Sequence, residues 1–264
     1  MKKTVLVSVI ASLLIVGCGG GGNATGSKDI KGKVVDGYVK GAKVYVDVNG
    51  NGKWDTTEPW CNTDVNGSYK LTVSNDVNNS CVIISEGGVD VDTDANVTVN
   101  FKSTIDKPII TPATTLVVDL MKKYNMPENE AIAKVATALG IDIKDVTKDP
   151  IECLKHGNDK PYKANFALHQ SAKMIAYANY EGNVTKTYMD FVKTIKNNHI
   201  KNISDMIDKC NANINIKEDT KVNIIDPVED GNITFAERVK IAKQIHNNMH
   251  SWCQNHNYFC QKNR

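Results

Sequence analysis

The sequence predicts an α+β protein: an N-terminal antiparallel β-sandwich of the prealbumin or immunoglobulin-like type, followed by an α-helical C-terminal domain. Residues 30–101 alternate apolar and polar side chains between glycine-containing turns, a pattern typical of short antiparallel strands. From residue 110 onward, apolar side chains recur at intervals of three and four, which indicates amphipathic helices. We therefore expect the β-sandwich over residues 30–110 and the helical domain over residues 111–264, because a chain of this length can hold two small cores.

The first 17 residues have the layout of a signal peptide, with two lysines followed by an apolar run from Thr4 to Val16. That run is too short to span a bilayer comfortably. The segment Ile15-Val16-Gly17-Cys18 resembles the lipobox of bacterial lipoproteins. The resemblance implies cleavage before Cys18 and acylation of that residue. An uncleaved anchor helix is the alternative.

Residues 18–29 are rich in glycine and small polar residues, which is typical of a flexible tether between a lipid anchor and a folded body. Gly19, rather than an aspartate, follows Cys18. By analogy with enteric sorting, this favours the outer membrane over retention at the inner membrane. We expect the protein to be anchored to the outer membrane by lipid, on its periplasmic or its surface face.

The charge balance argues against a polyanionic partner. The chain has 32 basic and 30 acidic residues, and loss of Lys2 and Lys3 with the leader leaves 30 of each. Net charge therefore suggests neither nucleic acid nor an anionic surface as partner.

No nucleophile elbow, His-Glu-x-x-His, phosphate loop or dinucleotide fingerprint occurs in the sequence. We expect no catalysis, but a role in binding or adhesion at the cell envelope, with a protein or glycan partner of unknown identity.

Five strands are expected before residue 110, at residues 30–35, 43–48, 68–73, 81–85 and 97–101. Turn sequences separate them, including Asp36-Gly37, Asn49-Gly50 and Gly87-Gly88.

The loop after the second expected strand has the spacing of a calcium site. Oxygen-bearing side chains stand at positions 1, 3, 5, 9 and 12 of a twelve-residue frame, with glycine at position 6. The expected ligands are the side chains of Asp47, Asn49, Asn51, Asp55 and Glu58 and the backbone carbonyl of Lys53. A hard cation such as Ca²⁺ takes six to eight oxygens, and this segment supplies nearly all of them. The alternative is a polar turn without metal.

The segments 32–37, 41–44 and 63–71 together resemble the carboxypeptidase-regulatory-like and Cna B-type β-sandwich modules of bacterial surface proteins. The calcium loop lies between two strands, as in the serine-aspartate-repeat B-like relatives, so the resemblance implies a sandwich rather than a helix-loop-helix site. The lysine, asparagine and acid that crosslink some Cna B-type modules have no recognisable counterpart. Residues 111–150 resemble a helical segment that often follows such sandwiches, and that resemblance implies no chemistry.

The helical region begins at Thr111-Pro112, a cap followed by proline in the first turn. A second helix opens within residues 126–130 and runs through Leu139, where Gly140 stops it. The expected helices lie at residues 113–123, 126–139, 162–180, 184–197, 200–210 and 234–252.

A second twelve-residue frame precedes the last expected helix. Its possible calcium ligands are Asp226, Asp230, Asn232, Thr234 and Glu237. Val228 occupies position 3, where an oxygen is expected, and loss of a ligand weakens such a site. The alternative is a helix start capped by Asp230 or Asn232.

Six cysteines remain once Cys18 is assigned to lipid, and an even number in an exported chain predicts disulfides. The candidates are Cys61, Cys81, Cys153, Cys210, Cys253 and Cys260. Their separation along the chain suggests the disulfides Cys61–Cys81, Cys153–Cys210 and Cys253–Cys260. Zinc binding by His246 and His250, with Cys253, His256 and Cys260 following them, is an alternative.

Seven Asn-x-Ser/Thr sequences occur, and in five of them an acidic residue stands two places before the asparagine. These five asparagines are Asn66, Asn78, Asn96, Asn183 and Asn232. The extended pattern resembles the acceptor of bacterial N-glycosylation systems, which act in the periplasm. The alternative is ordinary turn chemistry, for which Asp-x-Asn is well suited.

Two other functions remain possible on the sequence alone. One is a periplasmic carrier or enzyme with its site in the helical domain, which would need a deep pocket. The other is a structural subunit of an envelope assembly, which would expose a large apolar patch.

Overall fold

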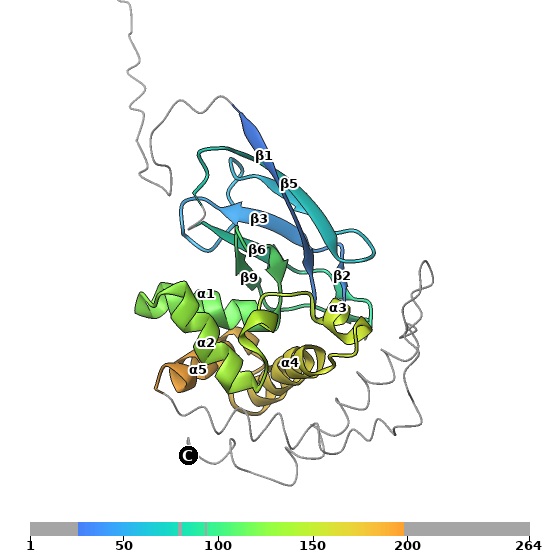
Figure 1. Ribbon diagram of the computed structural model, residues 1–264, viewed down its shortest axis with the longest axis vertical. Coiled ribbons are helices and arrows are strands. Elements are labelled where there is room, and N and C mark those ends of the chain that lie inside the picture. The colour runs from blue at the N-terminus through green and yellow to red at the C-terminus, as the bar shows by residue number, and fades with distance from the viewer. Residues whose placement is uncertain (1–25, 79–80, 93, 198–264) are drawn as a thin grey trace, which may run out of the picture.

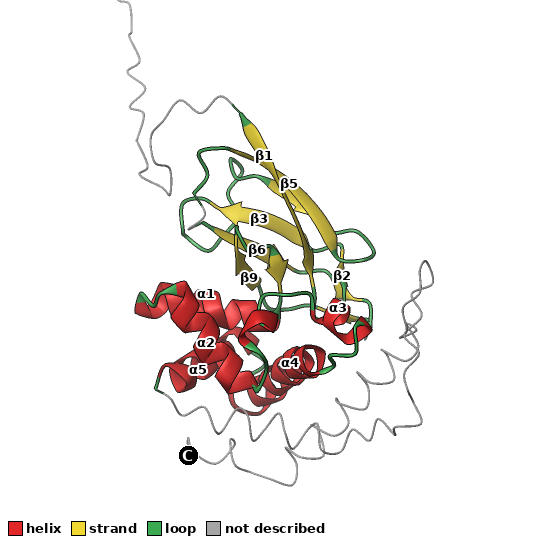
Figure 2. Ribbon diagram, viewed as in Figure 1, coloured by secondary structure: helices red, strands yellow, loops and turns green. Residues whose placement is uncertain are grey.

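The computed structural model describes residues 26–78, 81–92 and 94–197 (Figure 1). This part of the chain has mixed α and β content, with several antiparallel sheets and five α-helices. The strands come first along the chain and lie together, and the helices lie below them in the view of Figure 2.

One sheet is built around β1 (Ser27–Val34), which pairs antiparallel with β5 (Ser68–Ser74) and parallel with β10 (Ile109–Ile110). On β5 alternate side chains are buried, as the period of a half-buried strand requires. Gly32 allows the chain before β10 to pass close to β1, because a Cβ at this position would collide with the carbonyl oxygen of Pro108. That carbonyl accepts a hydrogen bond of 2.7 Å from the Tyr69 hydroxyl.

A second, antiparallel sheet has the order β4-β3-β6-β9. Its strands are β4 (Trp60–Asn62), β3 (Lys43–Asp47), β6 (Val82–Glu86) and β9 (Phe101–Thr104). β3 and β6 are central and are buried on both faces, which explains their continuous β-branched runs. A small third sheet joins β2 (Val39–Lys40), β7 (Val89–Asp90) and β8 (Ala95–Asn96).

The first helix, α1 (Pro112–Tyr124), begins at a capping box formed by Thr111 and Thr114. The same turn is bonded to the sheet: the backbone N–H of Lys102 on β9 donates to the Thr115 hydroxyl at 2.9 Å, and the Thr114 hydroxyl donates to the Lys102 carbonyl at 2.8 Å. The entry into the helical region is therefore fixed against β9.

The other helices are α2 (Glu128–Leu139), α3 (Pro150–Lys155), α4 (Lys160–Asn179) and α5 (Val184–Lys196), with a 3₁₀ turn at Ile143–Asp145. α2 ends at Gly140, whose φ of 66° is the left-handed conformation that closes a helix. The amide oxygen of Asn165 on α4 accepts the Ala113 N–H at 2.9 Å, so the start of α1 is also tied to α4.

One apolar core runs through strands and helices alike. The fully buried side chains of Val44 and Leu71 belong to the same cluster as those of Leu116 and Phe166. A smaller cluster under β3 contains Tyr45 and Val118. The division into domains at residue 110 stays a prediction.

Most expected elements are present, and their bounds differ from the expected ones by only a few residues. The strands expected at residues 30–35, 43–48, 68–73 and 81–85 and the first four expected helices are confirmed. The strand expected at residues 97–101 is wrong, since β9 begins at Phe101. Val97 and Val99 are buried and Thr98 is exposed, but residues 97–100 belong to no strand, because alternation reports burial and not pairing. The Val97 N–H still donates to the Gly88 carbonyl at 3.0 Å. α3 was not expected. The helices expected at residues 200–210 and 234–252 lie outside the described residues.

Candidate functional site

The expected calcium loop connects β3 to β4. Its base is closed by a hydrogen bond of 3.1 Å from the Val46 N–H to the Pro59 carbonyl. Gly50 and Gly52 have φ values of 75° and 74°, a region that L side chains rarely adopt. Both glycines have open space around them, so backbone conformation and not crowding requires them.

Three side chains in the first half of the loop fold back onto its backbone. Asp47 Oδ2 accepts the Gly52 N–H at 3.1 Å. Asn49 Oδ1 accepts the Asn51 N–H at 3.0 Å, and Asn51 Oδ1 accepts the Lys53 N–H at 2.7 Å. These short-range bonds direct the polar ends of the three side chains toward the inside of the turn.

The second half of the loop contributes two carboxylates to the same region. Asp55 Oδ2 accepts the amide N–H groups of both Asn49 and Asn51, at 2.6 and 2.8 Å. Glu58 accepts the Val48 N–H at 2.8 Å through Oε1 and the Asp55 N–H at 3.1 Å through Oε2. The sequence-predicted ligands are thus brought together in one compact loop.

One oxygen in this cluster is left without a hydrogen bond. Asp47 is only 5% exposed, and its Oδ1 is buried with no hydrogen-bond partner among the described residues. A buried carboxylate oxygen without a donor or a cation is costly. Glu58, at the other end of the loop, is equally buried. The residues present therefore fit a cation bound between the two ends of the loop.

Among the described residues, no three His, Cys, Asp or Glu side chains stand close enough to form a metal-binding group. The loop has only three carboxylates, and its other two expected side-chain ligands are asparagine amides. The N–H groups of the Asn49 and Asn51 amides face Asp55, so cation binding would require both amides to turn their oxygens toward the ion.

An aromatic pair borders the loop, and the sequence analysis missed it. The rings of Trp54 and Trp60 pack edge to face with centroids 6.0 Å apart. The Lys43 ammonium lies 3.1 Å from the Trp54 ring centroid and 5.0 Å from that of Trp60. Trp60 is 50% exposed, so the pair of rings with Lys43, hereafter the tryptophan patch, presents apolar surface to solvent.

Tyr45 lies under the loop and connects it to the sheet. Its hydroxyl is 3.5 Å from the Gly52 carbonyl, a long hydrogen bond. Burial, with the nearby carboxylates of Glu86 and Asp47, raises the pKa of Tyr45 to about 12. The phenol therefore stays neutral beneath the carboxylates of the loop.

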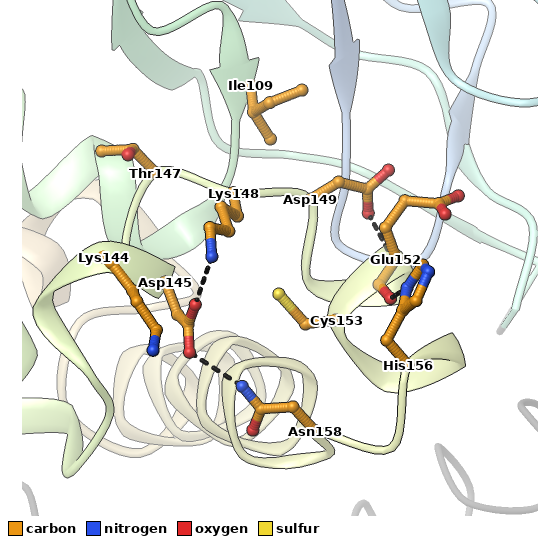
Figure 3. A pocket seen from close by; sticks show the side chains of 10 residues that line it. All are labelled: Ile109, Lys144, Asp145, Thr147, Lys148, Asp149, Glu152, Cys153, His156 and Asn158. Carbon is orange, nitrogen blue, oxygen red and sulfur yellow. Dashed lines mark hydrogen bonds and ion pairs between the residues drawn. The ribbon is translucent and has the colours of Figure 1, made fainter.

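A pocket of about 510 Å³ lies between β10 and residues 144–158 (Figure 3). Three of its polar side chains are engaged with one another: Asp145 pairs with Lys148 at 3.0 Å and accepts the Asn158 amide at 2.8 Å. Burial raises the pKa of the Cys153 thiol in its wall. The sequence pattern carried no signal for this pocket, because its walls come from separate segments.

A second pocket of about 810 Å³ shares Ile109, Asp149 and Glu152 with the first. Lys33 reaches into the boundary between them and forms ion pairs with Asp149 at 3.3 Å and with Glu152 at 3.7 Å. Lys33 also donates to the Tyr38 hydroxyl at 2.9 Å. These contacts link β1 to the start of α3.

A fully buried polar chain joins the strands to α4 and α5. His169 Nε2 lies 3.4 Å from Asp36 Oδ2, and His169 Nδ1 lies 3.2 Å from the Tyr188 hydroxyl. Burial, with Asp90 nearby, raises the pKa of Asp36 to about 8, while burial lowers the pKa of His169 well below its usual value. At neutral pH the contact therefore joins a neutral carboxyl to a neutral imidazole and is not an ion pair.

The expected disulfide between Cys61 and Cys81 is not formed, and Cys61 and Cys153 are free thiols. Cys61 lies on β4 and Cys81 immediately precedes β6, with β3 between those strands. Two strand spacings are about 9–10 Å, beyond the Cα separation that a disulfide spans.

Several expected site residues lie outside the described residues. These are Cys18, Cys210, Cys253 and Cys260, the second-loop residues Asp226, Asp230, Asn232, Thr234 and Glu237, and the possible zinc ligands His246 and His250. The other four glycosylation candidates, Asn66, Asn78, Asn96 and Asn183, are all exposed.

Comparison with known proteins identifies no relative: no protein family, no curated protein and no solved structure matches this chain. None of the helices in the described ranges is long and apolar enough to cross a membrane.

Proposed function

We propose that the protein is a lipid-anchored binding protein of the bacterial cell envelope, with a calcium-stabilised β-sandwich followed by a helical domain and without catalytic activity. The observation that carries the proposal is the loop between β3 and β4. Five oxygen-bearing side chains form hydrogen bonds within that loop, and Asp47 Oδ1 is buried without one among the described residues.

Calcium suits the loop because every ligand atom that these residues would contribute is an oxygen. Asp47, Asp55 and Glu58 would supply the negative charge, Asn49 and Asn51 neutral amide oxygens, and Lys53 its backbone carbonyl. A divalent ion would neutralise carboxylates that otherwise repel one another in a short segment.

The role proposed for the ion is structural. Asp47 ends β3, and Glu58 lies two residues before β4, so an ion held by both residues would cross-link the two strands. Calcium sites in extracellular modules commonly have dissociation constants of about 10⁻⁴–10⁻³ M. At 1 mM calcium such a site is about half to nine-tenths filled, so its proposed role is that of a clamp rather than a sensor.

The binding role rests on the surface beside this clamp. The tryptophan patch combines half-exposed aromatic surface with one ammonium group, features that suit contact with a glycan or a protein. The basic leader and Cys18 support the proposed lipid anchor on the outer membrane, periplasmic or surface-facing.

A small-ligand carrier is the second candidate, favoured by the pocket shown in Figure 3. Its volume of about 510 Å³ is within the usual range for ligand sites. Against this, its charged side chains already have partners, as Asp145 has in Lys148 and Asp149 has in Lys33. A ligand would have to break those pairs.

The calcium proposal is tested by thermal unfolding of the purified chain at pH 7, in excess chelator and in 10 mM calcium. For a dissociation constant of about 10⁻⁴–10⁻³ M, ligand linkage contributes about 1.4–2.7 kcal/mol. This corresponds to a rise in melting temperature of about 3–10 °C. Asp47→Asn should abolish most of the rise, since it removes one ligand charge but keeps the acceptor for the Gly52 N–H.

The matched control is Asp76→Asn, which removes an exposed charge outside the loop and should keep the full rise. Magnesium at the same concentration should give a smaller rise, because it demands a tighter octahedral shell. Equal melting temperatures with and without calcium would overturn the proposal.

A further inference from the structure

The frequency of acidic residues before the Asn-x-Ser/Thr sequences is higher than composition explains. Only 30 of 264 residues are acidic, so fewer than one of seven such sequences should have an acid two places before the asparagine. Five do. Asn23 and Asn202 are the two exceptions, with Gly21 and Ile200 at that place.

The structure places the four described members of the set at accessible points. Asn66 lies in the turn before β5, Asn78 in the turn that follows it, and Asn96 on the short strand β8. Asn183 caps α5. All four are exposed, although they come from different elements, as an enzyme that modifies a folded or folding chain requires.

Asn183 shows which atom is available for reaction. Its Oδ1 accepts the Lys186 N–H at 3.1 Å, as a helix cap does. That bond engages the oxygen and leaves the amide nitrogen Nδ2 without a partner among the described residues. Thr185, the hydroxyl residue of the sequence, is exposed beside it.

Turn chemistry explains the acid at some of these sites but not at all of them. Asp64 has a structural role, since its Oδ1 accepts the N–H groups of Asn66 and Ser68 at 2.8 and 2.9 Å. Glu181 has no such role. It is exposed, makes no side-chain hydrogen bond or ion pair within the described ranges, and has a φ of 52°. The left-handed region favours glycine or asparagine and disfavours glutamate.

We propose that the protein is N-glycosylated at the acid-preceded asparagines whose whole sequence the structure describes, Asn66, Asn96 and Asn183, with Glu181 acting as a recognition residue for Asn183. The donor is an oligosaccharide linked through its anomeric carbon to a polyprenyl diphosphate. Asn Nδ2 forms a bond to that carbon and loses a proton, the carbon–oxygen bond to phosphate breaks, and polyprenyl diphosphate leaves. The inference rests on the envelope location in the proposed function and is independent of calcium.

The first test is the intact mass of the chain purified from its native membranes, followed by peptide mapping. We expect mass increments in whole multiples of one oligosaccharide. Peptides with Asn66, Asn96 and Asn183 should carry the sugar, whereas those with Asn23 and Asn202 should not. A sugar-free mass, or equal occupancy at Asn202, would overturn the proposal.

The second test is Glu181→Gln, which keeps Asn183 and Thr185 unchanged. It should reduce occupancy at Asn183 at least tenfold and leave Asn66 and Asn96 as they were. Lys186→Gln, which removes an exposed charge three residues after Asn183, is the control and should keep the glycan. Full glycan occupancy at Asn183 in Glu181→Gln would show that the glycosylating enzyme does not recognise Glu181.

The same mass spectrum separates this inference from the envelope location. An acylated but sugar-free chain would overturn glycosylation alone. A chain that still carries residues 1–17 would overturn the lipid anchor as well.

Discussion

Asp36 is the side chain whose chemistry departs most from its sequence context. Asp36-Gly37 is typical of a turn, yet the carboxyl of Asp36 is completely buried against His169 of α4. Asp90, Asp92 and Lys173 are the other charged groups that act on it, and Tyr188 lies at the far side of His169. The sequence could not predict this contact, because it depends on packing between segments far apart along the chain.

The pKa values of Asp36 and His169 predict how stability depends on pH. Asp36 is protonated in the folded state up to about pH 8, so its contribution falls as pH rises from about 4 to 8. His169 has a lowered pKa, so its contribution rises with pH up to its unfolded pKa of about 6.5. The two trends oppose each other below pH 6.5, and only the loss from Asp36 remains between about pH 6.5 and 8.

Asp36→Asn should therefore flatten the decline of the free energy of unfolding over that upper range, measured by urea unfolding from pH 6 to 9. Each unit of pKa difference corresponds to about 1.4 kcal/mol, so the wild type should lose about 2 kcal/mol relative to the variant. Asp76→Asn, an exposed control, should follow the wild type. If the free energy of unfolding of Asp36→Asn changes with pH in parallel with that of the wild type, the raised pKa of Asp36 is wrong.

At the scale of elements, the β3–β4 loop is where the sequence was most informative. Its glycines, amides and carboxylates act through contacts only a few residues apart, so their spacing alone specifies the turn. The same reasoning failed for the strand expected at residues 97–101, because a partner strand decides where pairing begins. It also missed α3, whose six residues are too few to show a helical period.

Gly52→Ala tests whether the loop conformation controls cation binding. The φ of 74° disfavours alanine by about 1–2 kcal/mol, although the space around Gly52 is open. The variant should be less stable, and its melting temperature should rise less with calcium than that of the wild type. The matched control is Gly157→Ala, which also has a positive φ of 81° and open space but lies after α3.

Gly157→Ala should lose a similar amount of stability and keep the full rise with calcium. If both variants respond to calcium as the wild type does, the geometry of the loop does not govern binding.

At the scale of the whole molecule, the shared core predicts cooperative unfolding. Buried side chains of the strands and of α1, α4 and α5 form one cluster, and the cap of α1 is hydrogen-bonded to β9. The change of sequence period at residue 110 located the boundary between strands and helices. It could not reveal how much apolar surface the two regions bury against each other.

We expect the strands and helices to unfold in one transition. Helix loss can be followed by circular dichroism at 222 nm, and the sheet by fluorescence of Trp54 and Trp60 in a Trp252→Phe background. The two melting curves should coincide, as two-state unfolding requires. A fluorescence transition separated from the helical one by several degrees would instead indicate two independent domains.

The ladder between β1 and β5 has a mechanical consequence. Seven register pairs connect these strands, from Ser27 opposite Ser74 to Lys33 opposite Ser68. Tension transmitted by the proposed lipid anchor along the axis of β1 would enter at Ser27. The hydrogen bonds between β1 and β5 would then bear the load together in shear, instead of breaking one after another, so this attachment of the first strand would resist pulling.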